Sequence, residues 1–178
     1  MQKGLSLVGV MIATLILSGA MTSLVSYQVV MNQIRFDQRY VNMGSLLAAE
    51  GVELARGVVT ENRYSGSQWD EGLDQGRYRV DYTLDLSDGL QSVNTTTCSV
   101  NPDELNDSCR LKRNSSNQIY SHTGTDTEDE AVEIYRFVEV IDGSEDNEKR
   151  VVSTVVIRNR RTDKKAVYKA AVILYSTS

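Results

Sequence analysis

The longest apolar stretch of the chain occupies residues 4–34, which include no charged side chain. Lys3 precedes this stretch, Arg35 follows it, and residues 5–17 are almost wholly aliphatic. An α-helix rises about 1.5 Å per residue, so about 20 residues cross the hydrocarbon core of a bilayer, which is roughly 30 Å thick. The pattern therefore predicts a helix that meets a membrane.

Beyond residue 34 the hydrophobic pattern continues and becomes amphipathic. Small and apolar residues recur at i, i+3 and i+4 spacing, while Glu50, Glu53 and Arg56 lie off that stripe. The stripe consists of Gly44, Leu47, Ala48, Gly51, Leu54, Ala55 and Val58. We expect one helix over residues 5 to about 58, about 80 Å long. The rest of the chain should leave its first half uncovered. The small residues should let a sheet approach the second half closely.

The pattern from residue 59 to residue 178 is typical of a β-rich head domain. Residues 61–76, which include Trp69, are polar and predict a loop. Alternation of apolar and polar residues predicts a half-buried strand over residues 76–86. Three more strands are predicted over residues 131–141, 151–158 and 166–175. The expected fold class is therefore α+β, with a four-stranded antiparallel sheet whose apolar face is covered by the helix.

Composition and charge exclude several classes of protein. The chain has 178 residues, of which 40% are hydrophobic and 24% charged, and its formal net charge is −5. These values are not those of a disordered tail, a collagen-like repeat or a multi-pass membrane protein. Net acidity also argues against a dedicated nucleic-acid binder, because tight binding requires clustered Lys and Arg to neutralise phosphates.

The two cysteines, Cys98 and Cys109, are close together in sequence. Such an isolated pair in an exported chain predicts a disulfide, which places the head outside the cytoplasm. Closing so short a loop stabilises the fold by roughly 3 kcal/mol in the chain-entropy description. The alternative is half of a metal site, but the one histidine, His122, is distant in sequence.

Residues for catalysis are not apparent. His122 lies in a polar turn, and the sequence has none of the patterns Gly-x-Ser-x-Gly, His-Glu-x-x-His or Gly-x-x-x-x-Gly-Lys-Ser/Thr. We therefore expect no enzyme activity and no cofactor.

Two oppositely charged turns are the remaining candidates for binding. Asp142, Glu145, Asp146 and Glu148 carry carboxylates on one turn, as hard cations require, and are weak calcium candidates, although their spacing is not that of an EF-hand. Arg158, Arg160, Arg161, Lys164 and Lys165 form a basic turn. This turn has no interleaved aromatic residues to stack bases, so contacts between subunits or simple solvation are favoured over nucleic-acid binding.

Three fates fit the apolar N-terminal stretch. The first is a permanent anchor, with Lys3 on the cytoplasmic side. The second is a signal peptide that is cleaved after the small residues 18–20. In the third, cleavage occurs just before the apolar stretch, which then remains in the mature protein. The apolar pattern does not stop at Ala20, and the order Lys3-Gly4-Leu5 favours the third fate.

These residues resemble the start of a type IV prepilin or a type II secretion pseudopilin. The stretch 49–53, Ala-Glu-Gly-Val-Glu, and the later Trp69 are similar to the same family. The resemblance implies that a prepilin peptidase removes residues 1–4 by cutting between Gly4 and Leu5, and that Leu5 is then N-methylated. Where the family normally has Glu, this chain has Gly9, which favours a minor or tip subunit.

The resemblance also implies a role. The chain is expected to be a structural subunit of a type IV pilus-like filament that serves adhesion, motility or DNA uptake. It would wait in the cytoplasmic membrane with its head outside the cytoplasm and then join an extracellular filament. Membrane insertion and assembly are assigned to Leu5, Leu7, Val8, Gly9, Val10, Ile12, Leu15, Ile16 and Leu17.

The expected partners are other pilin subunits, the peptidase, and an assembly platform with its motor. Two alternatives remain open: a pseudopilin of a secretion or DNA-uptake piston, and a single-pass anchored or secreted binding module.

Overall fold

The structure is a computed structural model of the 178-residue chain. It describes residues 7–80, 90–93, 98, 105, 107–113, 119–122, 131–145, 147–160 and 162–176. The chain divides into two compact units, residues 1–40 and residues 41–178, which we call the N-terminal unit and the head. Each unit is described by itself.

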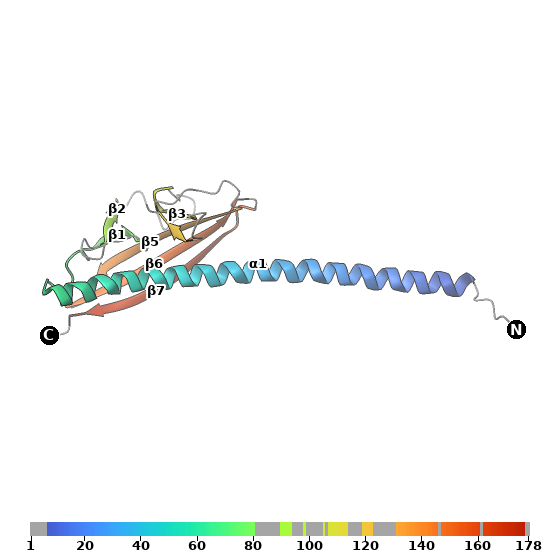
Figure 1. Ribbon diagram of the computed structural model, residues 1–178, viewed down its shortest axis with the longest axis horizontal. Helices are drawn as coiled ribbons and strands as arrows, with labels where there is room; N and C mark the ends of the chain where they lie inside the picture. Colours follow the sequence, from blue (N-terminus) through green and yellow to red (C-terminus); the bar gives the residue numbers. More distant parts are fainter. Residues whose placement is uncertain are drawn as a thin grey trace. The chain divides into compact units, whose positions relative to one another are not determined.

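Helix α1 runs from Leu7 to Ser65 (Figure 1), so the prediction of one continuous helix is confirmed. It ends later than the predicted residue 58, because its last two turns are held by the following loop. The Asn62 side-chain amide donates to the carbonyl oxygens of Trp69 and Glu71 at 3.2 and 2.8 Å. Gly66 then ends the helix with a φ of 75°, a conformation that glycine adopts without a Cβ penalty.

The strands form one antiparallel sheet built around β5, and the predicted α+β fold is confirmed. Its strands are β1 (Gly76–Arg79), β2 (Gln91–Val93), β3 (Arg110–Arg113), β4 (Tyr120–Ser121), β5 (Val132–Asp142), β6 (Glu148–Asn159) and β7 (Lys165–Tyr175). One edge of β5 pairs with β6, which pairs with β7. The other edge pairs first with β3 and then with β1.

The predicted number of four strands was wrong. All four predicted strands are present, but β2 pairs with β1 and β4 with β3, which gives seven strands among the described residues. Strands β2, β3 and β4 have only two to four residues each, too few to show alternation in sequence. The predicted continuation of β1 to residue 86 lies outside the described residues.

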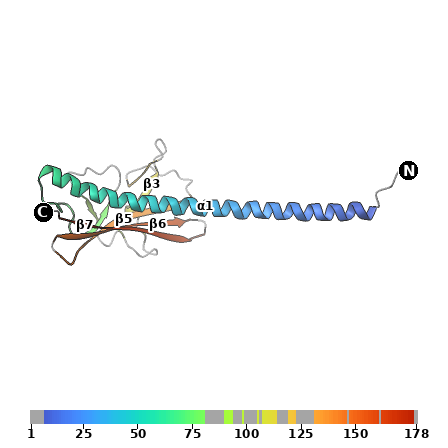
Figure 2. The same cartoon turned by 90° about the horizontal axis from the view of Figure 1, so that it is seen from below.

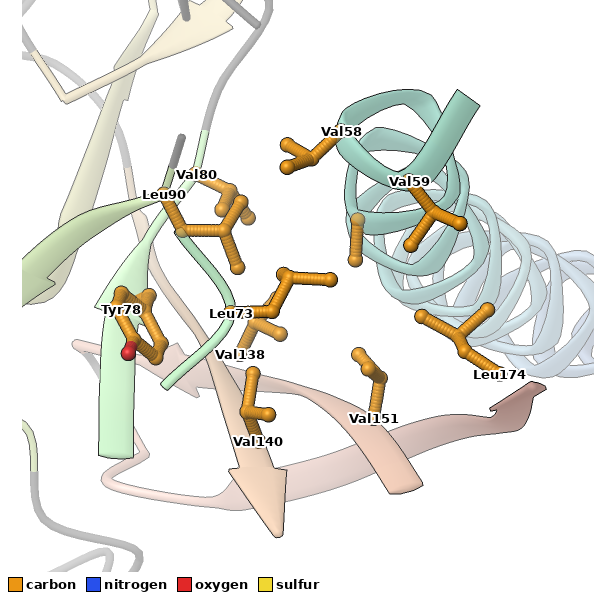
Figure 3. Close-up of a cluster of buried hydrophobic side chains, with 11 residues drawn as sticks. Val58, Val59, Leu73, Tyr78, Val80, Leu90, Val138, Val140, Val151 and Leu174 are labelled. Atoms are coloured by element: carbon orange, nitrogen blue, oxygen red, sulfur yellow. The ribbon is translucent and has the colours of Figure 1, made fainter. Parts of the chain in front are cut away.

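The core of the head lies between the second half of α1 and one face of the sheet, as Figures 1 and 2 show. In Figure 3, Val58 and Val59 of α1 point toward Leu73 from the loop and Val138 from β5. The other buried members of this cluster are Ala55, Tyr78, Val80, Leu90, Val140, Val151 and Leu174. At about 25 cal/mol per Å² of apolar surface, burial of these side chains is the main stabilisation of the head.

Two glycines let the helix approach the sheet, as the sequence predicts. A Cβ on Gly44 would overlap the ring of Tyr168, and a Cβ on Gly51 would overlap the Ser153 hydroxyl and come within 3.3 Å of Val138. The stripe of small residues therefore sets the distance between helix and sheet.

Candidate assembly segment and charged sites of the head

The apolar half of α1 is exposed at every residue from 7 to 30. Leu7 is 76% exposed, and none of the most apolar 18-residue window is buried. The assembly residues that the structure describes, Leu7, Val8, Gly9, Val10, Ile12, Leu15, Ile16 and Leu17, all lie on this surface. By length and composition α1 is able to cross a membrane. The predicted processing site, Gly4 and Leu5, lies outside the described residues.

The serine and threonine hydroxyls described in this segment are hydrogen-bonded within the helix, which sequence reasoning did not anticipate. Thr14, Ser18, Thr22, Ser23 and Ser26 each donate to a backbone carbonyl three or four residues earlier, at 2.8–3.1 Å. A hydroxyl that is hydrogen-bonded in this way needs no water, so it lowers the cost of placing the helix in an apolar environment.

A buried arginine joins the helix to the sheet. The Arg136 side chain is 0% exposed, and its Nη1 lies 3.0 Å from a carboxylate oxygen of Glu50 on α1. Its Nη2 donates to the carbonyl of Val80 at 2.5 Å, and its Nη1 donates to the carbonyl of Leu47 at 3.4 Å. Sequence reasoning missed this pair. The available signal was an arginine between the hydrophobic residues Tyr135 and Phe137 at the centre of β5.

The predicted disulfide is present between Cys98 and Cys109. Both cysteines are buried and cluster with Phe137 of β5. The Arg77 guanidinium lies 5.7 Å from the centre of the Phe137 ring and donates to the Cys98 carbonyl at 2.8 Å. The bridge itself therefore packs against β5, beside a cation–π contact.

The acidic turn between β5 and β6 contains an ammonium group at its base. Lys149 Nζ lies 2.7 Å from Asp142 and 3.5 Å from Asp70. The hydrogen bond that Lys149 donates to Asp142 raises the pKa of Lys149 above its ordinary value. Glu145 and Glu148 are described and Asp146 is not. Among the described residues, no group of three or more His, Cys, Asp or Glu side chains is arranged to hold a metal ion.

The basic turn between β6 and β7 belongs to a larger cluster that the sequence did not reveal. Guanidinium nitrogens of Arg110, Arg158 and Arg160 lie 3.8, 3.6 and 3.4 Å from the carboxylate of Glu133, whose side chain is 9% exposed. The Tyr135 hydroxyl donates to the same carboxylate at 3.1 Å. Three cations therefore share one carboxylate of β5: Arg110 comes from β3, Arg158 from β6, and Arg160 from the turn after β6.

A second carboxylate completes this cluster at its exposed edge. Asp163 accepts a hydrogen bond from Arg158 at 2.7 Å, which lowers the pKa of Asp163 and raises that of Arg158. Asp163 has a φ of 52°, a left-handed conformation that a tight turn between two strands requires. Arg161, which the sequence also placed in this turn, lies outside the described residues.

Comparison of the chain with protein-family models, with curated proteins and with solved structures finds no match. The architecture itself, a long apolar N-terminal helix combined with an antiparallel sheet, is compatible with a pilin-like protein.

Proposed function

We propose that this chain is a structural subunit of a type IV pilus-like filament. A prepilin peptidase cuts it after Gly4, the membrane holds it by the first half of α1, and assembly transfers that helix from lipid to the helices of neighbouring subunits. The head stays outside the cytoplasm throughout. The mechanism is assembly and not catalysis.

The observation that carries this proposal is the uncovered apolar surface of α1. Within the part of the chain that the structure describes, every residue from 7 to 30 is exposed, although the same helix continues to Ser65. Exposed apolar surface costs about 25 cal/mol per Å² in water, so this segment requires a lipid environment or other apolar helices. A membrane provides the lipid environment, and a filament core of parallel helices provides the other apolar helices.

Gly9 supports a minor or tip position for the subunit. A charged N-terminal amine in apolar surroundings is costly unless a carboxylate pairs with it. With glycine at this position, residue 9 offers no carboxylate to the amine of a neighbouring subunit. Such a subunit is best placed where no other subunit follows.

The disulfide supports the same location for the head. A structural bridge between Cys98 and Cys109 persists in an oxidising compartment and is rare in the cytosol.

Mass spectrometry of the N-terminal peptide, on protein purified from its native envelope, tests the proposal. We expect a chain that begins at Leu5 and carries one added methyl group. A chain that begins at Met21 would mean signal-peptide cleavage and would refute the filament role. An unprocessed chain would mean a plain membrane anchor. Electron microscopy of sheared filaments then distinguishes a surface fibre from a short secretion piston.

A further inference from the structure

We propose that strand β7 of one head pairs antiparallel with β7 of a second copy, so that the two heads form a closed pair with one continuous sheet. The occupant of the β7 edge is therefore a second copy of this chain. The argument for that occupant is that the open edge of β7 is complementary to itself under a two-fold rotation. The contact itself needs only the head and goes beyond the proposed function.

Strand β7 forms the one long edge of the sheet among the described residues. It pairs with β6 along its whole length and with no other described strand (Figure 1). The other edge strands, β2 and β4, have three and two residues, and so short an edge offers little to an incoming chain. By contrast, β7 has eleven residues and no proline. Such an edge is a template for pairing with another strand.

Two backbone hydrogen bonds fix which groups of β7 point outward. The Asn159 amide donates to the Lys164 carbonyl just before β7, at 2.9 Å. The Ser176 amide donates to the Asn147 carbonyl just after β7, also at 2.9 Å. In an antiparallel ladder every second residue bonds to the same neighbour, so the even-numbered residues of β7 bond to β6. The residues whose N–H and C=O groups face the open edge are then Val167, Lys169, Ala171 and Ile173.

The side chains of this open row are exposed on the face of the sheet that α1 does not cover. Tyr168 lies against Gly44 of α1, so the even-numbered side chains of β7 face the helix and the odd-numbered ones face away from it. Val167 is 44% exposed and Ile173 is 45% exposed. The two outward residues between them are exposed as well. The open row therefore presents an apolar side chain to water at each of its ends.

Two features set the register of a second β7 on this row. The Tyr175 carbonyl accepts a hydrogen bond from Arg63 of α1 at 2.7 Å, so the open row ends at Ile173. A two-fold axis at Lys169 would place each lysine opposite its own copy, and like charges directly opposite one another are destabilising. The axis therefore falls at Ala170, midway along the open row.

In this register the open row is complementary to itself. Val167 of each copy lies opposite Ile173 of the other, and such β-branched apolar pairs stabilise a sheet. Lys169 lies opposite Ala171, whose small side chain leaves room for the lysine stem. Opposite residues of a hydrogen-bonded pair exchange both of their bonds, which gives about eight backbone hydrogen bonds between the two strands. The contact uses the open edge of both copies, so the pair is closed and does not grow into an array.

The pair joins two filaments and not two neighbours within one filament. In the head, α1 and β7 run in the same direction. Gly44 lies against Tyr168 near the start of β7, and Arg63 contacts Tyr175 at its end. Antiparallel β7 strands therefore make the two head helices antiparallel, whereas a filament core requires parallel helices. The contact thus suits the tip position that Gly9 favours, and this place for it rests on the proposed function.

Cross-linking of two cysteine variants tests the register. Val167→Cys and Ile173→Cys lie directly opposite one another in the proposed pair, at a separation that a disulfide spans. Each variant alone places its cysteine opposite a residue that cannot react. The native cysteines are buried and bonded to each other. We expect a mixture of the two full-chain variants, mildly oxidised in nonionic detergent, to give at least about tenfold more cross-linked dimer than either variant alone.

A proline at the open edge tests the backbone contact. Ala171→Pro removes an outward N–H and leaves the bonds to β6 in place, because residue 171 does not bond to β6. Added to both cysteine variants, it should lower the dimer yield of the mixture by about tenfold. Ala171→Val keeps the N–H and is the matched control, so it should change the yield by less than about twofold. Circular dichroism shows whether each variant is folded.

The pairing is refuted if the mixture gives no more dimer than the single variants. An edge that receives a strand of a different protein gives this outcome. The pairing is also refuted if Ala171→Pro, in a folded chain, leaves the yield unchanged, or if Ala171→Val lowers it equally. If the proline variant does not fold, the comparison of the mixture with the single variants decides the question.

The N-terminal mass spectrum of protein from its native envelope separates the two proposals. A chain that begins at Met21 refutes the filament role, and the cross-links still decide whether β7 pairs. A methylated chain that begins at Leu5, together with no dimer specific to the mixture, refutes the β7 pairing alone.

Discussion

The ion pair between Arg136 and Glu50 makes the strongest prediction about stability. Changing Glu50 to Gln leaves a guanidinium that is 0% exposed without its carboxylate, at a position where the nitrogen–oxygen distance is 3.0 Å. Removing one partner of a buried pair typically costs about 3–5 kcal/mol. Because Glu50 is 38% exposed, water reduces this penalty, and we expect a loss of about 2 kcal/mol in the free energy of unfolding.

Replacing both members should be less harmful than the sum of the single changes. Arg136→Met removes the buried charge together with its hydrogen bonds, so Glu50→Gln adds little in that background. We expect a coupling energy of about 1–2 kcal/mol in the double-mutant cycle. Glu53→Gln is the matched control, because it breaks an exposed pair with Arg56 on the same helix and should cost less than about 0.5 kcal/mol.

Guanidinium titration of the full chain in detergent, followed by the fluorescence of Trp69, provides the measurement, since Trp69 packs against the core of the head. The reasoning is wrong if Glu50→Gln is no more destabilising than Glu53→Gln. It is equally wrong if the coupling energy is zero, since the carboxylate then does nothing for the buried arginine.

Three further predictions follow from the head. Cys109→Ser removes the disulfide and should lower the free energy of unfolding by about 3 kcal/mol, with no additional effect of a reducing agent on thermal unfolding. Gly51→Leu should cost about 1–3 kcal/mol in the same titration because the new side chain meets Val138, whereas Ala49→Leu on the exposed side should change little. Stability should fall as the pH rises above about 10, because burial raises the pKa of Tyr78 above 10.0 and the Asp142 hydrogen bond raises the pKa of Lys149 above 10.5. The unfolded chain therefore releases these protons first, and Tyr78→Phe should reduce the slope of stability against pH.

The elements that follow from the sequence are those with a long, regular period. Eleven or twelve residues of β5, β6 and β7 are enough to show their strand character, and α1 repeats its small and apolar residues over many turns. The disulfide also followed from the sequence, because the chain has two cysteines and they lie close together. These features depend on local patterns or on composition, which are present in the sequence whether or not the chain is folded.

Tertiary structure decided which distant groups meet. Glu50 and Arg136 are each ordinary in their own segment, and only the crossing of α1 over β5 pairs them. The convergence of Arg110, Arg158 and Arg160 on Glu133 depends in the same way on strand register, which places β3 and β6 on the two edges of β5. Short strands such as β3 form because β5 presents an edge, and not from their own propensity. Charge pairing and edge pairing are relations between segments, so periodicity within one segment does not encode them.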